Sequence, residues 1–199
     1  SLYSISTASA NVAIGKETLY SATTGGSNTA LGHQAMYYGT ESDSNVAVGQ
    51  SALEKNVTGD DNTAIGYQSQ YGVSGQSHSN NTSVGYQSLY SITTGGNNTA
   101  LGYQSAYSLT TGQQNVHIGS NAGINATGDF NSFVGYNAGR GAGGSATGVY
   151  NVALGREALR KYTSGQKNIA IGGLALYEAT SGSSNVAVGD NALRNNTTG

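Results

Sequence analysis

The 199-residue chain contains no cysteine, no proline and no tryptophan, and only one methionine and two phenylalanines. The absence of cysteine excludes a disulfide-stapled scaffold and thiolate metal sites. Charged residues make up 9% of the chain, well below the roughly 25% of an ordinary soluble domain. The net charge of −2 has the wrong sign for a phosphate-binding surface, which needs clustered lysine and arginine. Nucleic acid is therefore not expected as a partner.

Long apolar runs are also missing. None approaches the roughly 18 residues that a membrane-spanning helix needs, so membrane insertion is not expected. Hydrophobic residues account for 36% of the chain, against ~45–50% in globular domains. This composition is thin for a globular core and is also compatible with disorder. The order of the residues decides between these two readings.

A pentapeptide of the form Asn-x-x-(Ile/Leu/Val)-Gly, with alanine at its third place in eight copies, recurs eleven times, usually every 17 residues. The asparagine is taken as position one; position four is always Ile, Leu or Val, and position five is always Gly. The asparagines are Asn11, Asn28, Asn45, Asn62, Asn81, Asn98, Asn115, Asn131, Asn151, Asn168 and Asn185. The glycines are Gly15, Gly32, Gly49, Gly66, Gly85, Gly102, Gly119, Gly135, Gly155, Gly172 and Gly189. No linker interrupts the series, which predicts one continuous domain over residues 1–199.

The pentapeptide predicts a β-strand. In Val12-Ala13-Ile14 the β-branched side chains share one face and alanine takes the other. A glycine always comes too soon for a stable helix of ~10–14 residues. We therefore expect an all-β parallel β-solenoid of about eleven coils, spaced ~4.8 Å apart in a rod of roughly 50 Å. Stacked position-one asparagines would form an amide ladder, and the position-five glycines would serve a turn with positive φ or a close backbone approach.

Two repeats combine a large residue at one position with glycine at another. Position three is usually alanine and position nine is often leucine. In the seventh repeat, however, His117 accompanies Gly123, and in the eighth, Phe133 accompanies Gly139. Because packed cores conserve volume, the two side chains are expected to fill one space, either within a coil or between chains.

The predicted core is too thin for a single chain. Both faces of the strand look buried, and a strand buried on both sides needs a second layer. We infer a homo-oligomer in which one face packs along a common axis; a homotrimer suits a wedge-shaped coil, although periodicity does not determine the number. Residues 1–5 match positions eight to twelve of a repeat, and Gly199 falls at position fifteen. We therefore expect a rod that is cut from, or stacks into, a longer fibre.

Strings such as Asn62-Thr-Ala-Ile-Gly-Tyr-Gln-Ser and Asn98-Thr-Ala-Leu-Gly-Tyr-Gln-Ser resemble the repeats of phage tail fibres and bacterial surface fibres. They are also similar to the head repeats of trimeric autotransporter adhesins. The resemblance covers essentially all of residues 1–199. It implies a homotrimeric, left-handed parallel β-roll that reaches and binds other surfaces.

The templates for enzymes, cofactors and metals find little support. Gly139–Gly144 satisfies Gly-x-Gly-x-x-Gly, but the residues that follow are not a helix start, so loop glycines are expected. The three histidines share no metal-ligand spacing. His117 could reach an ion only if position three faced a three-fold axis, and plain packing is favoured. Asp60-Asp61 and Asp129 are expected as solvated turn charges rather than calcium ligands. No cofactor and no enzyme activity is expected.

Tyrosine gathers at two repeat positions. Position ten holds Tyr3, Tyr20, Tyr37, Tyr71, Tyr90, Tyr107 and Tyr177. Position six holds Tyr67, Tyr86, Tyr103 and Tyr136. Stacked ladders that bury ring area between coils are favoured. The alternative is a sugar-binding stripe with Gln68, Gln87 and Gln104, because residues 62–128 contain no Asp, Glu, Lys or Arg.

The fourth repeat gains two residues around Gln70–Asn80, and the eighth gains three around Arg140–Tyr150. Insertions in repeat proteins map to surface loops, and such loops carry binding residues. The candidate ligand-binding residues are Tyr71, His78, Arg140 and Tyr150. Tolerated loop variation is the competing explanation.

The sequence thus predicts a non-enzymatic, extracellular structural or adhesive protein. We expect a shaft or head segment of a homotrimeric tail fibre or cell-surface adhesin, presenting many weak contacts to a host surface or its glycans. One alternative is a self-assembling filament of end-to-end stacked solenoids without a receptor. An ice-binding solenoid using the Thr23-Thr24, Thr93-Thr94 and Thr110-Thr111 pairs is weaker, because adjacent residues point to opposite faces. A depolymerising enzyme lacks a recurring carboxylate pair.

Overall fold

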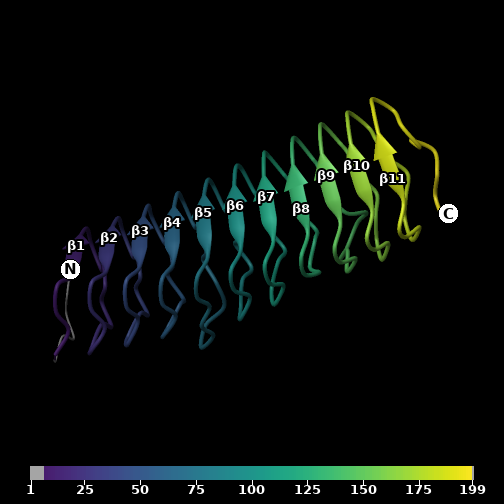
Figure 1. Cartoon of the computed structure of the whole chain (residues 1–199). Helices are drawn as coiled ribbons and strands as arrows, with labels where there is room; N and C mark the ends of the chain where they lie inside the picture. Colours follow the sequence, from purple (N-terminus) through teal and green to yellow (C-terminus); the bar gives the residue numbers. More distant parts are fainter. Residues whose placement is uncertain (1–6, 199) are drawn as a thin grey trace.

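The computed structural model describes residues 7–198, so the expectations for Tyr3, for residues 1–5 and for Gly199 lie outside the described residues. Each pentapeptide forms a three-residue strand over positions two to four, and Figure 1 shows the strands side by side along a rod. The eleven strands of residues 7–198 are β1 (Val12–Ile14), β2 (Thr29–Leu31), β3 (Val46–Val48), β4 (Thr63–Ile65), β5 (Thr82–Val84), β6 (Thr99–Leu101), β7 (Val116–Ile118), β8 (Ser132–Val134), β9 (Val152–Leu154), β10 (Ile169–Ile171) and β11 (Val186–Val188).

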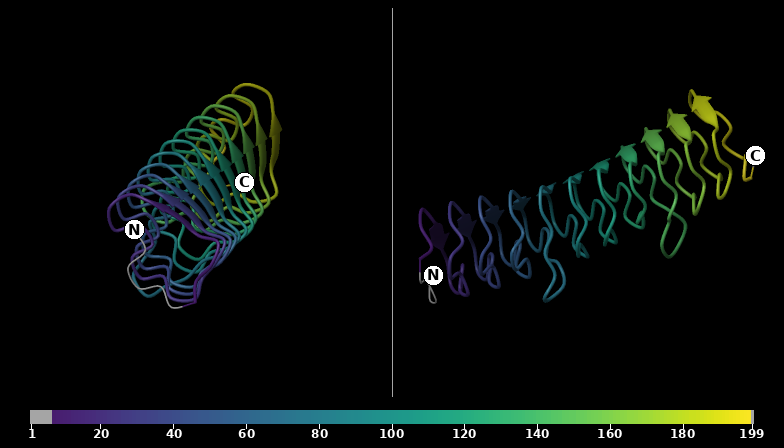
Figure 2. Two further views of the ribbon diagram at one scale, coloured as in Figure 1. Left: turned by 90° about the vertical axis from the view of Figure 1, so that its left-hand side faces the viewer. Right: turned by 60° about the horizontal axis from the view of Figure 1, so that its bottom comes forward.

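The strands form one parallel sheet in chain order, and each pairs with the strand of the next repeat. The register places equivalent positions opposite each other, as for Ala13 with Ala30. Hydrogen bonds between coils continue at both strand ends; for example, Val12 N–H donates to the Asn28 carbonyl at 2.8 Å. Viewed nearly end-on, the strands line one side of the coil stack and the turns close the rest (Figure 2, left). The expected parallel β-solenoid is confirmed.

The strand alternation follows the sequence pattern. Position three points into the coil, and Ala30, Ala47 and Ala64 are fully buried there. Positions two and four point outward. A small alanine suits the inward site because the opposite wall of the narrow coil is close, while β-branched residues suit the outward face.

The position-five glycine meets two requirements at once. Gly85 has a φ of +139°, and a Cβ there would lie 2.4 Å from the carbonyl oxygen of Gly102 in the next coil. The same relationship links Gly102 to Gly119, with a φ of +133° and a distance of 2.6 Å. An L-residue would therefore be strained and would also collide with the neighbouring coil. Both predicted reasons for this glycine hold.

The predicted asparagine ladder is present, and it also closes each coil. The Asn98 backbone N–H donates to Asn81 Oδ1 at 3.0 Å, and the Asn98 side-chain Nδ2 donates to the same oxygen at 3.1 Å. Nδ2 of Asn98 also donates to the carbonyl of Gly112, at position fifteen of its own coil, at 2.9 Å. One buried amide thus satisfies groups from two coils, which a buried turn requires.

The interior is a narrow column of small and aliphatic side chains. Position nine contributes fully buried residues at Leu19, Met36, Leu53, Leu89, Leu159 and Leu176. These positions have left-handed backbone conformations, with φ of +48° at Leu19 and +52° at Leu89. Such a conformation costs about 1–3 kcal/mol for a non-glycine residue and persists where its surroundings hold it in place. Here the Leu89 N–H donates to the Ser105 carbonyl of the next coil at 3.0 Å.

The two large-for-small exchanges pack within single coils. A Cβ on Gly123 would lie 2.4 Å from His117 Nδ1, and a Cβ on Gly139 would lie 2.3 Å from the Phe133 ring. The rings of His117 and Phe133 stack on each other with centroids 5.0 Å apart. The inward ring takes the volume that leucine fills in other coils.

Candidate functional site

The outward face of the sheet is apolar and uncovered in the single chain. This face, called the sheet face below, consists of positions two and four of the eleven strands described. It carries Val, Ile, Leu, Thr and Ser, and no charged residue. Ile14 and Val188, on the two end strands, are 58% and 67% exposed. In the middle of the rod, Leu101, Ile118 and Val134 are half-buried. Because the register is continuous, these side chains form one stripe along the rod, and monomeric soluble proteins rarely expose such a patch.

The tyrosines form stacked columns between coils. At position six, the ring centroids of Tyr67 and Tyr86 are 5.2 Å apart, and those of Tyr86 and Tyr103 are 5.3 Å apart. Beside them, Gln87 Nε2 donates to Gln68 Oε1 at 2.9 Å, and Gln104 continues the amide chain at 3.0 Å. The predicted stacking is confirmed for Tyr67, Tyr86 and Tyr103, whereas Ser120 separates Tyr136 from them. The amides keep further donor and acceptor capacity at a neutral surface.

The position-ten column is built the same way. Tyr90 lies between Tyr71 and Tyr107, with centroid distances of 5.1 and 5.0 Å. Partial burial, and then the neighbouring phenol of Tyr107, raise the pKa of the Tyr90 hydroxyl. The Lys55 ammonium lies 4.2 Å from the Tyr71 ring centroid. Glu54 interrupts the column after Tyr71, and beyond it Tyr20 and Tyr37 stack at 5.0 Å.

The four candidate residues of the insertions lie in different surroundings. Figure 2 (right) shows wider loops on the coils that carry them. Tyr71 belongs to the stacked column, and Tyr150 is exposed and stacks on Phe130 at 4.8 Å. His78 is buried, and burial lowers its pKa to about 4, so its ring does not face a ligand in solvent. Arg140 is half-buried. The structure therefore does not bring the four residues together in one site.

His117 is a packing residue. Position three points into the coil and not toward an axis between chains, so the condition for an ion site at His117 fails. Its ring is fully buried, neither ring nitrogen has a hydrogen-bond partner, and burial lowers its pKa to about 3. Over residues 7–198 no three His, Asp or Glu side chains gather as metal ligands.

The turn aspartates accept backbone hydrogen bonds from the neighbouring coil. Asp60 Oδ1 accepts from the Asp43 N–H at 2.7 Å, and Asp129 Oδ1 accepts from the Gln113 N–H at 2.9 Å. Gly139–Gly144 opens no helix, and Gly139 serves the packing of Phe133. Two of the turn threonines donate their hydroxyls to the backbone of the next coil: Thr23 Oγ1 to the Thr40 carbonyl at 3.1 Å and Thr93 Oγ1 to the Thr110 carbonyl at 3.0 Å. A hydroxyl held by the backbone is less suited to ordering ice.

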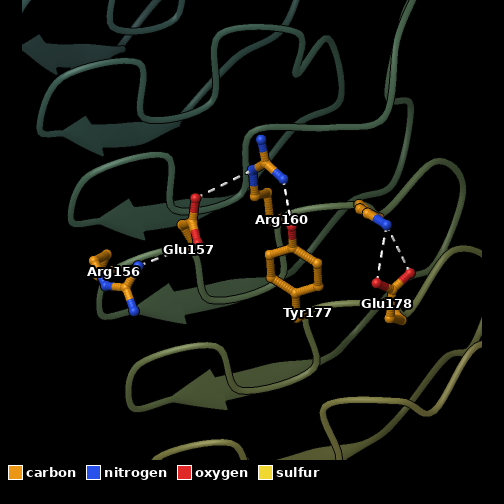
Figure 3. A network of polar contacts seen from close by, with 6 residues as sticks. Arg156, Glu157, Arg160, Tyr177 and Glu178 are labelled. Atoms are coloured by element: carbon orange, nitrogen blue, oxygen red, sulfur yellow. Dashed lines mark hydrogen bonds and ion pairs between the residues drawn. The ribbon is translucent and has the colours of Figure 1, made fainter.

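Charged side chains connect coils nine and ten, as Figure 3 shows. Lys161 Nζ lies 2.9 Å from Glu178 Oε1, and Arg160 donates to the Tyr177 hydroxyl. Glu157 Oε1 lies 3.5 Å from Arg160 Nε. Partly exposed pairs of this kind are worth ~0–1 kcal/mol each, so they adjust the stacking of coils more than they determine it.

Sequence reasoning missed a polar segment of the core. Gln70 is buried at position nine, where leucine is usual, and its Nε2 donates to the Thr63 carbonyl at 2.9 Å and to Ser83 Oγ at 3.0 Å. Ser69 and Ser83 hydroxyls bond to each other across the same space. Two replacements in the sequence accompany it: Gln70 in place of the usual leucine and Ser83 in place of the usual alanine.

No pocket opens in the surface formed by residues 7–198, so the candidate sites are extended faces and columns. None of these residues forms a helix long and apolar enough to cross a membrane. The chain matches no family model, no curated protein and no solved structure with significance.

Proposed function

We propose that the chain is a shaft or head segment of a non-enzymatic, extracellular fibre, of the tail-fibre or surface-adhesin kind, built from three copies that pack their sheet faces around a common axis. The observation that carries this proposal is the uncovered sheet face. It is uncharged and continuous over the eleven strands described, and apolar except for the threonines and one serine at position two. Each square ångström of apolar surface buried contributes ~25 cal/mol.

A second chain supplies the layer that the fold lacks. The inward face of each strand is covered by its own coil, which leaves no further element of residues 7–198 to cover the outward face. Copies of the same chain present the same stripe with the same repeat spacing, so their side chains can interdigitate along the whole length. Cyclic closure covers every copy equally, and a trimer leaves the turns and tyrosine columns on the outside.

Such a rod acts mechanically. Backbone hydrogen bonds run from coil to coil along its length, and the side-chain ladders reinforce them. A stiff multi-chain rod presents each surface feature in several copies, so weak contacts with a host surface add up to firm attachment.

The mass of the particle and a sheet-face variant test the proposal. Light scattering on the native protein should give three chain masses. Val84→Glu places a charge on the sheet face and should shift the protein toward single chains, while Thr111→Glu, at an exposed position in a turn, should keep the native mass. A native mass of one chain would overturn the proposal. Polymers of unlimited length would favour the end-to-end filament.

A further inference from the structure

The tyrosine column at position six is interrupted at one coil, which carries Ser120 in place of tyrosine. The space beside Ser120, between Tyr103 and Tyr136, is called the open rung. Tyr67, Tyr86 and Tyr103 occupy consecutive coils and stack on one another. The next coil has Ser120 at this position, and the coil after it has Tyr136. Tyr103 and Tyr136 are 50% and 52% exposed, more than the other two tyrosines of the column.

The open rung has room for one further stacked ring between Tyr103 and Tyr136. Neighbouring rings of this column have centroids 5.2 and 5.3 Å apart. Tyr136 lies two coil spacings beyond Tyr103, with the coil of Ser120 between them, which corresponds to ~10 Å along the rod. A ring at the level of Ser120 would therefore lie about 5 Å from each tyrosine, within the range at which ring faces attract.

The surroundings of the rung are neutral and rich in hydrogen-bonding groups. Residues 62–128 contain no charged side chain. The amide chain of Gln68, Gln87 and Gln104 ends at Gln104, in the coil next to Ser120. The Ser120 side chain adds a hydroxyl at the same level.

We propose that the open rung at Ser120 binds one sugar ring of a neutral oligosaccharide between Tyr103 and Tyr136. A pyranose has two faces of C–H groups, which suit the negative faces of the two phenol rings, and a rim of hydroxyls, which suits the amide and serine groups. The coils from Tyr67 to Ser120 carry no cation for an anionic glycan. Beyond Tyr136, position six of the next coil is Arg156, which lies 3.4 Å from Glu157 Oε2. An aromatic side chain of a partner would leave the polar groups unused.

The proposal rests on the proposed function and deepens it by naming the ligand class. The chain turns at the glycine of position five, so the position-six tyrosines lie beyond the end of the strand and not on the sheet face. Packing of the sheet faces therefore leaves the rung open to solvent. A trimer would carry three such sites at one level of the rod.

Filling the rung is the sharpest test. Ser120→Tyr completes a column that already accepts tyrosine, so the variant should fold and keep its melting temperature while the binding site disappears. The matched control is Glu54→Tyr, which fills the equivalent gap between Tyr37 and Tyr71 in the position-ten column. The probes are cellohexaose, chitohexaose, maltohexaose and mannohexaose, with hexagalacturonate as the anionic counterpart, followed by saturation-transfer NMR and calorimetry.

At least one neutral hexasaccharide should bind the native protein and the Glu54→Tyr variant alike, and Ser120→Tyr should weaken that binding by about tenfold or more. Absence of binding by all four neutral probes at millimolar concentration would overturn the proposal. Undiminished binding by Ser120→Tyr, equal loss in both variants, or binding of hexagalacturonate alone would also overturn it. The particle mass tests the proposed fibre separately from glycan binding. If no glycan binds but the mass is that of three chains, only the glycan proposal fails. A single-chain mass would overturn the proposed fibre whatever the glycan result.

Discussion

Gly139 packs directly against the ring of Phe133 in the same coil, so closely that a Cβ on residue 139 would lie 2.3 Å from the ring. Leucine occupies the same position in six other coils of the described chain, with alanine at position three in five of them and Ser83 in the sixth. Volume in this core is therefore conserved inside each coil, between positions six residues apart.

Single and double substitutions at residues 133 and 139 test this conservation of volume directly. Gly139→Ala should destabilise the protein by about 1–3 kcal/mol because the methyl group collides with the ring. Phe133→Ala should cost about 3–5 kcal/mol by opening a cavity. The double variant Phe133→Ala/Gly139→Leu restores the usual pair and should recover most of the loss, since leucine is tolerated at the left-handed φ of position nine. Urea unfolding at fixed protein concentration measures all three. Simple additivity of the single changes would refute the shared-volume explanation.

The position-five glycines should be the least replaceable residues of the coil. Gly102→Ala combines a φ of +133° with a Cβ 2.6 Å from the Gly119 carbonyl oxygen, so we expect a loss of about 3 kcal/mol or more. Gly143→Ala is the matched control, since a Cβ there meets nothing within 4 Å, and it should change stability by less than about 0.5 kcal/mol. Thermal unfolding compares the two variants. Similar melting temperatures would show that the close approach between coils is not needed.

Stability should fall in acid because of the buried His117. Burial lowers its pKa from 6.5 to about 3, so the unfolded chain binds a proton in a pH range where the folded chain does not. The stabilisation is complete above pH 6.5 and is lost progressively as the pH falls toward about 3. His78, with a pKa lowered to about 4, acts in the same direction.

His117→Phe should therefore flatten the dependence of the unfolding free energy on pH between 6.5 and 4, while keeping the stack on Phe133. Phe133→Leu serves as the control, because it weakens the same stack at every pH without removing a titrating group. Denaturant unfolding at several pH values gives the slopes. A His117→Phe slope equal to that of the native protein would contradict the buried neutral imidazole.

The fold was predictable because one rule repeats eleven times. The glycine and the branched residue of each pentapeptide place the strand and its turn, and the asparagine ladder follows from the register. The repeat does not show which strand face is inward. The burial of His117 inside the coil could therefore not be predicted from the sequence and is seen only in the structure. The left-handed φ at position nine was also not predictable, because leucine disfavours it, and hydrogen bonds such as that from Leu89 N–H to the Ser105 carbonyl of the next coil form only in the folded stack.

The insertions show the limit of sequence reasoning on the candidate site. A lengthened repeat predicts a loop, and wider loops are present. It does not predict which side chain of the loop turns inward, and His78 does so. Similarly, the tyrosine pattern predicts stacking, whereas the open rung at Ser120 gains meaning only when the spacing of neighbouring rings is known.

Thiol labelling tests the central claim, that sister chains cover the sheet face, most directly. The chain has no cysteine, so Val84→Cys and Thr111→Cys each introduce a single thiol, and both positions are exposed in the isolated chain. If sheet faces pack together, the thiol at residue 84 should react with a maleimide at least about tenfold more slowly than the thiol at residue 111 in the native particle, and equally fast after unfolding. Equal rates in the native particle would contradict the account.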